Sequence, residues 1–168
     1  MLAIALLIFG ITARLLPHEY NFTPVTAIAL FGGAYLSRRY AVILPLALMV
    51  ISDIFIGLHD TIFFTWGSVI LIALLGTQIK DRKTPAIVLG SSLVSALLFF
   101  IITNFGAWLS DLYPHNFNGL IDCYTLAIPF FRTTLISSVL YGVILFGSYE
   151  LIAAAVKRTR FAKALLTI

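Results

Sequence analysis

Long apolar runs alternate with short polar connections along this chain. A helix that crosses a bilayer needs about 20 predominantly apolar residues, and fewer where surrounding protein shields its ends. Six segments fit this description, and the first two are the shortest. They are residues 1–16, 23–37, 40–58, 61–79, 85–109 and 133–156. The pattern predicts an all-α integral membrane protein built as a bundle of six transmembrane helices.

Composition agrees with a membrane protein and argues against a soluble one. Mean hydropathy is +1.05 and 11% of the residues are charged, a combination typical of chains that reside in lipid. The 168 residues are too few for a membrane unit plus a separate soluble domain, so we expect one membrane domain over residues 1–168. The single cysteine, Cys123, excludes an internal disulfide framework.

The positive charges fall at particular ends of the apolar runs. Nine of the eleven Lys and Arg residues form three clusters, which follow the second, fourth and sixth runs. The clusters are Arg38-Arg39, Lys80/Arg82/Lys83 and Lys157/Arg158/Arg160/Lys163. Because cytoplasmic loops carry the excess of Lys and Arg, all three clusters and both termini are predicted to be cytoplasmic. The same placement accounts for the net charge of +4 without nucleic-acid binding.

The first apolar run is interpreted as a permanent helix. It is apolar from Leu2 onward and lacks the positive region that begins a secretory signal. A signal cleaved near Ala13 is the alternative, and it would place the new N-terminus outside while leaving the basic clusters inside.

Three connections are then expected on the outer side, at residues 14–22, 58–60 and 110–132. The last is long, and long loops without a function are uncommon. Its second half is apolar and aromatic, which predicts a short interfacial or re-entrant helix over Leu120–Phe131, stopped by Pro129.

Two polar residues lie within the apolar runs near the outer side. Asp53 lies about five residues inside its run, or roughly 8 Å from the end. A charge at such depth normally faces a polar interior. Asp53 is therefore interpreted as a ligand contact or as the partner of Arg14 or Arg132 in a salt bridge, and the two roles are compatible. Asn104 lies at similar depth and needs a hydrogen-bond partner, which is either a ligand or a neighbouring helix.

Arg14 and Arg132 are the two cations on the outer side. Snorkelling to the interface is one explanation. Recognition of an anionic or amide-rich ligand is the other, because a guanidinium group binds carboxylate or phosphate through two N–H groups. Tyr124 is one of several tyrosine and tryptophan residues at this boundary, where an aromatic belt is expected and a planar ligand could also stack.

Each outer connection contains one histidine: His18, His59 or His115. Imidazoles from separate loops can bind a transition metal, but their spacing is not diagnostic, and solvated loop histidines are the alternative. His18, which follows Pro17, is the one we select as a ligand contact.

Motifs for the commonest catalytic sites are absent. The chain contains no G-x-x-x-x-G-K-[ST], no H-E-x-x-H and no G-x-S-x-G. We therefore expect a non-enzymatic protein without an intrinsic cofactor, whose energy comes from another subunit or a gradient. A membrane enzyme using His18 and Asp53 is the alternative.

Small residues recur at four-residue spacing inside the runs, as at Ala29/Gly33, Ser91/Ser95 and Ser138/Gly142. Such pairs let helices approach closely in lipid. We interpret them as packing within the bundle, with a partner-docking face as the alternative.

Several short strings resemble a family of small bacterial transport proteins. They are Arg14-Leu-Leu-Pro-His18, Asn21-Phe-Thr-Pro24, Leu30-Phe-Gly-Gly-Ala-Tyr35, Ser52-Asp53, Thr103-Asn-Phe-Gly-Ala-Trp108 and Ile128-Pro-Phe-Phe-Arg132. That family is similar to the substrate-binding S-components of energy-coupling-factor (ECF) transporters, and in particular to the BtuM family of solitary cobalamin S-components.

The resemblance implies six helices, cytoplasmic termini and an outward pocket. It implies ligand contacts at His18, Asp53 and Arg132, with Arg14 and Asn104 beside them. Two features depart from it. Residues 1–13 lack the Ala-x-x-x-Ala motif with which S-components often dock a coupling subunit, and this favours a solitary protein. The mid-chain cysteine that ligates cobalt in some BtuM proteins is also missing, so His18 is the candidate cobalt ligand.

These observations lead to one expected function. The chain is expected to take up a vitamin across the bacterial inner (cytoplasmic) membrane, with cobalamin as the first candidate. The ligand would bind in an outward pocket formed by Arg14, His18, Asp53, Asn104, Arg132 and Tyr124. Its partners would be the vitamin and the lipid bilayer, without nucleic acid. The alternatives are an S-component for another small vitamin or a transition-metal ion, an intramembrane enzyme, and a structural protein.

Overall fold

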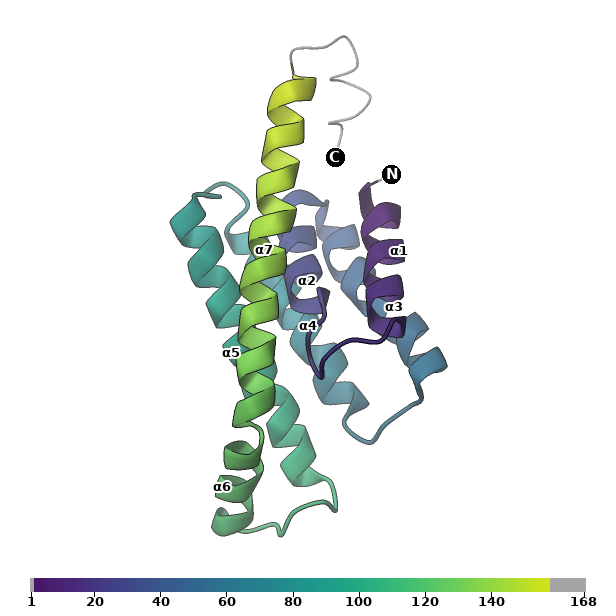
Figure 1. The fold of residues 1–168 in the computed structure, drawn as a ribbon, viewed down its shortest axis with the longest axis vertical. Helices are drawn as coiled ribbons and strands as arrows, with labels where there is room; N and C mark the ends of the chain where they lie inside the picture. The colour runs from purple at the N-terminus through teal and green to yellow at the C-terminus, as the bar shows by residue number, and fades with distance from the viewer. Residues whose placement is uncertain (1, 158–168) are drawn as a thin grey trace.

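The computed structural model describes residues 2–157, which form an all-α bundle without strands in that range (Figure 1). Seven helices follow one another along the chain. They are α1 (Leu2–Leu15), α2 (Val25–Tyr35), α3 (Arg38–Ile56), α4 (Ile62–Gln78), α5 (Pro85–Leu109), α6 (Phe117–Leu126) and α7 (Ile128–Val156). Arg158, Arg160 and Lys163 of the third basic cluster, and the predicted locations of the termini, lie outside the described residues.

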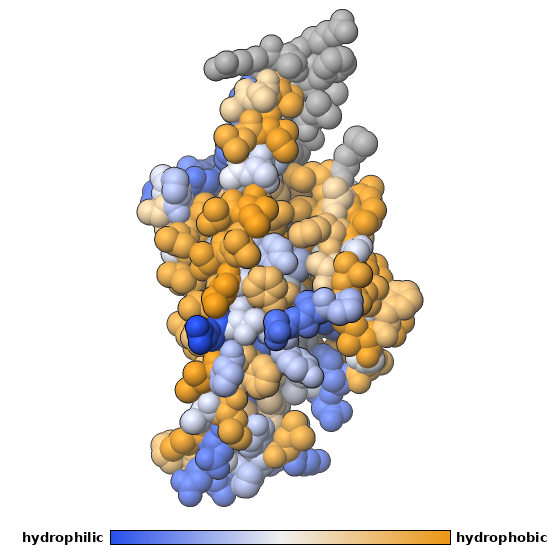
Figure 2. Space-filling view, in the orientation of Figure 1, coloured by the Kyte–Doolittle hydropathy of each residue, from blue (hydrophilic) through white to orange (hydrophobic). Residues whose placement is uncertain are grey.

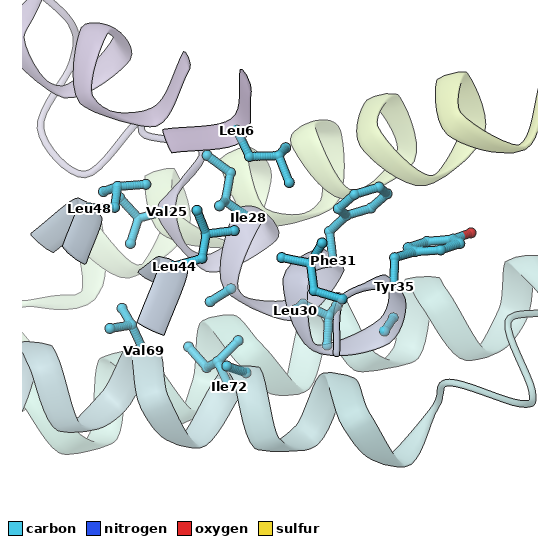
Figure 3. Packing of buried hydrophobic residues seen from close by; sticks show 14 of the residues in the cluster. Leu6, Val25, Ile28, Leu30, Phe31, Tyr35, Leu44, Leu48, Val69 and Ile72 are labelled. Carbon is cyan, nitrogen blue, oxygen red and sulfur yellow. The ribbon is translucent and has the colours of Figure 1, made fainter. Parts of the chain in front are cut away.

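Helix α2 is the centre of the bundle. All of its residues, from Val25 to Tyr35, are buried, and α3, α4 and α7 pack around it. The apolar core consists of α2 side chains such as Ile28, Leu30 and Phe31 against Leu48 of α3 and Ile72 of α4 (Figure 3). At 1.5 Å per residue its 11 residues span roughly 16 Å, so α2 covers only about half of a 30 Å hydrocarbon layer.

Glycine allows α2 and α4 to cross in direct backbone contact. A Cβ atom on Gly33 would lie 2.0 Å from the carbonyl oxygen of Ala73, and one on Gly76 would lie 2.2 Å from that of Leu30. Gly142 of α7 similarly leaves room for Ser92 of α5. The close helix packing predicted from small residues is therefore present within the bundle at Gly33 and Gly142.

Three helices are long and apolar enough to cross a membrane: α3, α5 and α7. Helices α1, α2 and α4 are apolar but shorter. Four of the first five predicted segments contain α1, α2, α4 and α5, and the fifth matches α5 from Pro85 to Leu109. Helix α3 begins at Arg38, two residues before the third predicted segment. The structure is thus that of a helical membrane protein.

The short helix α6 and the start of the last long helix, α7, differ from the prediction. The short helix occupies Phe117–Leu126 instead of Leu120–Phe131, and Pro129 lies in the first turn of α7 instead of ending a helix. Proline lacks an N–H group, and the first turn of a helix has no intrahelical partner for one, so Pro129 fits there. Asn116 marks the start of α6, because its side chain accepts a hydrogen bond from the Gly119 amide at 2.9 Å.

The helix ends are distributed between the two ends of the bundle as the charge pattern predicts. The start of α1, the α2–α3 and α4–α5 connections and the end of α7 lie toward one end of the bundle (Figure 1). Arg38 and Arg39 begin α3, the second cluster lies between α4 and α5, and Lys157 follows α7. We call this the basic end. The α3–α4 connection, the α5–α6 connection and α6 lie toward the opposite end.

Candidate functional site

A cavity of about 270 Å³ lies beside the start of α2, between α1, α3, α5 and α7. We call it the outer cavity, because it lies beside the α1–α2 connection, which the sequence predicts to be on the outer side. Hydrophilic residues cross the face of the molecule at the level of the α1–α2 connection, below a mostly hydrophobic surface (Figure 2). The cavity is lined by Arg14, His18, Tyr20, Asn21, Thr23, Val25, Thr26, Met49, Ile56, Phe99, Thr134 and Ser137.

The α1–α2 connection forms one wall because it is fixed to α7. Asn21 has a φ of 61°, a left-handed conformation that asparagine tolerates better than most residues. Its carbonyl oxygen accepts a hydrogen bond from the Ser137 hydroxyl at 3.3 Å. The Tyr20 ring packs edge-on against Phe130, with the two ring centroids 6.0 Å apart. The wall is therefore anchored at two points on α7.

Arg14 ends α1 and turns its guanidinium group toward α3. Nη1 contacts the Ser52 hydroxyl at 2.8 Å and the Met49 sulfur at 2.9 Å. Nη2 lies 2.8 Å from Asp53 Oδ1. The side chain is 15% exposed, so the group is held largely out of solvent. A guanidinium has five N–H groups, and the Nε–H group takes no part in these contacts, which leaves donor capacity on a residue that lines the cavity.

Asp53 lies behind Arg14 instead of on the cavity wall. Its side chain is 1% exposed, and Trp66 Nε1 donates a hydrogen bond to Oδ2 at 2.8 Å. Two arginines were considered as salt-bridge partners of Asp53, and the structure shows that the partner is Arg14. The carboxylate neutralises the guanidinium charge, since a buried charge without a partner is costly. The predicted contact between Asp53 and a ligand is therefore indirect in this arrangement.

His18 is exposed at the mouth of the cavity. Its Nδ1 lies 2.7 Å from the Glu19 carbonyl oxygen and its Nε2 lies 3.4 Å from the Arg14 carbonyl oxygen. A neutral imidazole that donates through Nδ1 keeps a lone pair on Nε2. The ring can therefore offer Nε2 to a ligand or a metal only after it turns away from the Arg14 carbonyl oxygen.

The start of α2 lies at the wall of the outer cavity. Val25 and Thr26 line it, and no side chain caps the helix. The first amides of a helix have no intrahelical acceptor and carry the positive end of the helix dipole. Together with Arg14, this end of α2 favours an electron-rich group, such as a carboxylate or amide oxygen.

Arg132, which was predicted to share the pocket, does not line it. Arg132 is exposed on the second turn of α7 and has neither an ion pair nor a hydrogen bond within residues 2–157. Thr134, two residues later, does line the cavity. Residues two apart on a helix do not face the same way, so Arg132 points elsewhere.

Asn104 and Tyr124 are also absent from the cavity lining and instead join α5 to α6. The Asn104 amide donates to the Phe100 carbonyl at 2.7 Å, within its own helix. The Tyr124 hydroxyl donates to the Ile101 carbonyl at 2.7 Å, and the Cys123 thiol to the Asn104 carbonyl at 3.3 Å. Burial raises the pKa of both the Cys123 thiol and the Tyr124 phenol, so both groups stay protonated as hydrogen-bond donors.

The three histidines do not converge. His59 bonds the Thr61 hydroxyl at 2.9 Å and His115 contacts the Ser110 carbonyl at 3.2 Å, each beside its own loop. Within residues 2–157, no group of three or more His, Cys, Asp or Glu side chains is placed to hold a metal ion. A three-histidine metal site, considered from the sequence, is therefore not assembled in this part of the chain.

Sequence reasoning missed Trp66 and the hydroxyl groups of α7. Thr134 and Ser137 line the outer cavity, and Ser138 bonds Thr26 at 2.7 Å. These residues recur at three- and four-residue spacing within an apolar helix, a polar stripe that indicates an interior face. Trp66 carries no comparable signal, because an isolated tryptophan in an apolar run is also expected to pack against lipid or at an interface.

Comparison with known proteins places the chain in a family without assigning it an activity. No curated protein and no solved structure matches the chain significantly. Residues 1–162 match DUF6580, which is described as a family of unknown function. Since this match covers nearly the whole chain, the protein belongs to the DUF6580 family.

Proposed function

We propose that this protein is an S-component-like uptake protein of the bacterial inner membrane, which binds a small vitamin in the outer cavity. In this proposal α1–α5 and α7 are the six spans, and the basic end faces the cytoplasm. The observation that carries the proposal is the outer cavity itself, where Arg14 and the start of α2 converge on one pocket inside an apolar bundle. Pockets with a few convergent polar groups are the usual form of small-molecule sites.

The cavity volume bears on the ligand. Drug-sized ligands occupy clefts of roughly 300–1,000 Å³, and the outer cavity, at about 270 Å³, lies just below that range. It suits a small vitamin with a carboxylate or amide group that can accept from Arg14. Cobalamin, our first candidate from the sequence, is much larger and would have to sit mainly above the mouth. To reach its cobalt, the His18 ring would have to turn Nε2 away from the Arg14 carbonyl oxygen.

Energy coupling is part of the same proposal. The first helix lacks the Ala-x-x-x-Ala docking motif, so we expect a solitary protein that releases its ligand without an ECF coupling module. Uptake of radiolabelled ligand into proteoliposomes containing only this protein checks that expectation. Uptake seen only after an ATP-driven module is added contradicts it.

Ligand binding is tested with four vitamins, two of which are matched in shape. Nicotinate and nicotinamide differ in the carboxylate and amide groups, and biotin and cobalamin extend the range of size. Isothermal titration of the detergent-solubilised protein should give heat with at least one of the four, and mass spectrometry should find a small molecule extracted with the protein. The absence of binding heat with all four probes, together with the absence of a co-extracted small molecule, would contradict the proposal.

Matched histidine variants locate the site. His18→Ala removes a cavity-lining side chain, whereas His115→Ala removes an exposed histidine of the α5–α6 connection. Affinity should fall about tenfold in His18→Ala, the value of roughly one hydrogen bond of 1.4 kcal/mol, and stay unchanged in His115→Ala. Equal affinities in the two variants would place the ligand elsewhere.

A further inference from the structure

A second cavity lies at the basic end, between α5 and α7 and far along the bundle from the outer cavity. Its volume is about 500 Å³, and we call it the basic-end cavity. Lys83, from the α4–α5 connection, and Glu150, on α7, both line it, as does Tyr35 at the end of α2. The remaining walls are mainly apolar. This pocket shares no lining residue with the outer cavity.

Two opposite charges face this cavity without pairing. The Tyr35 hydroxyl donates a hydrogen bond to Glu150 Oε1, and the Lys83 ammonium lies 4.7 Å above the centre of the Tyr35 ring. Lys83 also donates to the Lys80 carbonyl oxygen. Within residues 2–157 no ion pair joins Lys83 to Glu150, and Oε2 of Glu150 has no partner there. The Tyr35 side chain contacts both charged groups, and a molecule carrying both signs of charge could bridge them.

An apolar groove continues from this cavity along the same two helices. It has a volume of about 430 Å³ and shares Val143 with the basic-end cavity. Its other lining residues are Leu93, Leu135, Ile136, Val139 and Leu140. From Val143 to Leu135 the groove follows α7 for eight residue steps, or roughly 12 Å, which is most of one leaflet of a 30 Å hydrocarbon core.

The position along the bundle corresponds to a lipid headgroup and its chain. Lys83 belongs to the basic cluster that ends an apolar run, where side chains meet the headgroup layer. Leu89, Leu93, Leu140 and Val143 are exposed on the outer surface of α5 and α7, so the groove opens toward lipid.

We propose that the basic-end cavity and its groove bind one phosphatidylethanolamine molecule. Its phosphate would lie at Lys83, its primary ammonium would donate to Glu150 Oε2, and an acyl chain would fill the groove below Val143. A phosphatidylcholine headgroup has the same charges but no N–H to donate, and phosphatidylglycerol has no cation for Glu150. Charge-assisted hydrogen bonds are the stronger ones in proteins, so the ammonium decides the selectivity. The proposal requires that this protein lies in a membrane. It does not depend on which vitamin the outer cavity binds.

Native mass spectrometry of the full chain tests this directly. The purified protein is mixed with equal amounts of phosphatidylethanolamine, phosphatidylcholine and phosphatidylglycerol that share the same acyl chains. The phosphatidylethanolamine adduct should exceed each of the others about tenfold, the value of one charge-assisted hydrogen bond. Equal adducts, or a preference for phosphatidylglycerol, would overturn the proposal.

Variants with matched controls complete the test. Glu150→Gln should abolish the preference over phosphatidylcholine, and Lys83→Met should lower binding of both lipids. Glu19→Gln and Lys80→Met make the same chemical changes at positions that do not line the cavity, and they should leave the adducts unchanged. If Glu150→Gln does not fold, Val143→Trp serves instead, because Val143 is 57% exposed and an indole there would block the groove. Unchanged selectivity in Glu150→Gln, or unchanged adducts in Val143→Trp, would overturn the proposal.

Discussion

At the scale of single residues, the centre of the candidate site is a guanidinium group with a carboxylate behind it. Arg14 has contacts from three residues of one helix, α3, at 2.8 or 2.9 Å. Asp53 is in turn fixed by the Trp66 indole. The pair presents donor groups to the outer cavity without a full buried charge. Such an arrangement suits a ligand that binds through hydrogen bonds from a positioned arginine.

Removing the carboxylate from this pair should cost stability. Asp53→Asn leaves Arg14 largely buried without an anion, and breaking a buried pair from one side costs about 3 kcal/mol. In the double variant Arg14→Met/Asp53→Asn neither charge remains, so its loss of stability should be well below the sum of the two single losses. Thermal unfolding in detergent measures this, with Asp111→Asn, an exposed acid, as the control. Additive losses would show that the pair is not coupled.

The sequence identified the charged residues of the site but not their grouping. Arg14 lies in the last turn of α1 and His18 in the connection that follows, and both line the outer cavity. Asp53 was recognised by its depth, and its partner was left open between two arginines. Asn104 was placed in the pocket by its depth, and Arg132 by its position at the outer end of an apolar run and by the family resemblance. Depth gives the position of a residue along the helix axis. Whether the residue lines a cavity also depends on which face of the helix it occupies, and an isolated polar residue does not reveal that face.

At the scale of helices, the α2–α4 crossing depends on two glycines in backbone contact. The sequence indicated this packing through Ala29 and Gly33, although nothing in it identified α4 as the partner. The bounds of α5 were predicted at both ends, since Pro85 and the polar residues after Leu109 mark them. The boundary between α6 and α7 was misplaced, because a proline can end one helix or begin the next. Here Pro129 lies in the first turn of α7.

The crossing can be tested with one methyl group. Gly33→Ala would place a Cβ atom 2.0 Å from the Ala73 carbonyl oxygen, so α2 and α4 must separate, at a cost of about 1–3 kcal/mol. Gly67→Ala, on α4 itself, meets nothing within 4 Å and should be neutral or stabilise by up to about 1 kcal/mol through helix propensity. Melting temperatures in detergent compare the two. A Gly33→Ala protein as stable as Gly67→Ala would contradict the crossing.

At the scale of the whole molecule, the charge pattern of the sequence and the fold distinguish the same two ends of the bundle. The basic clusters within the described residues lie toward one end, and the three histidine-containing connections lie away from it (Figure 1). Hydropathy and the positive-inside rule were enough to predict this. They could not predict that α2 would be wholly enclosed by protein, because an apolar helix surrounded by helices and one surrounded by lipid have similar compositions.

Single-cysteine labelling tests the six-span topology. With Cys123 replaced by Ala, cysteines are introduced at Glu19, Asp60 and Asp111 on the proposed outer side and at Asp81 on the proposed inner side. A membrane-impermeant maleimide added to intact spheroplasts should label the first three and leave position 81 unlabelled until the membrane is permeabilised. If only α3, α5 and α7 crossed the membrane, positions 60 and 81 would react alike.

The enclosure of α2 also has a consequence for how the protein is made. A segment of 11 residues, roughly 16 Å long, is too short to partition into a bilayer as an independent span. The three helices that pack around it, α3, α4 and α7, are all synthesised after it. In a membrane, α2 therefore has to be held by the insertion machinery or by its neighbour α1 until later helices arrive. Stable insertion of α2 during biogenesis should therefore depend on the helices that are synthesised after it.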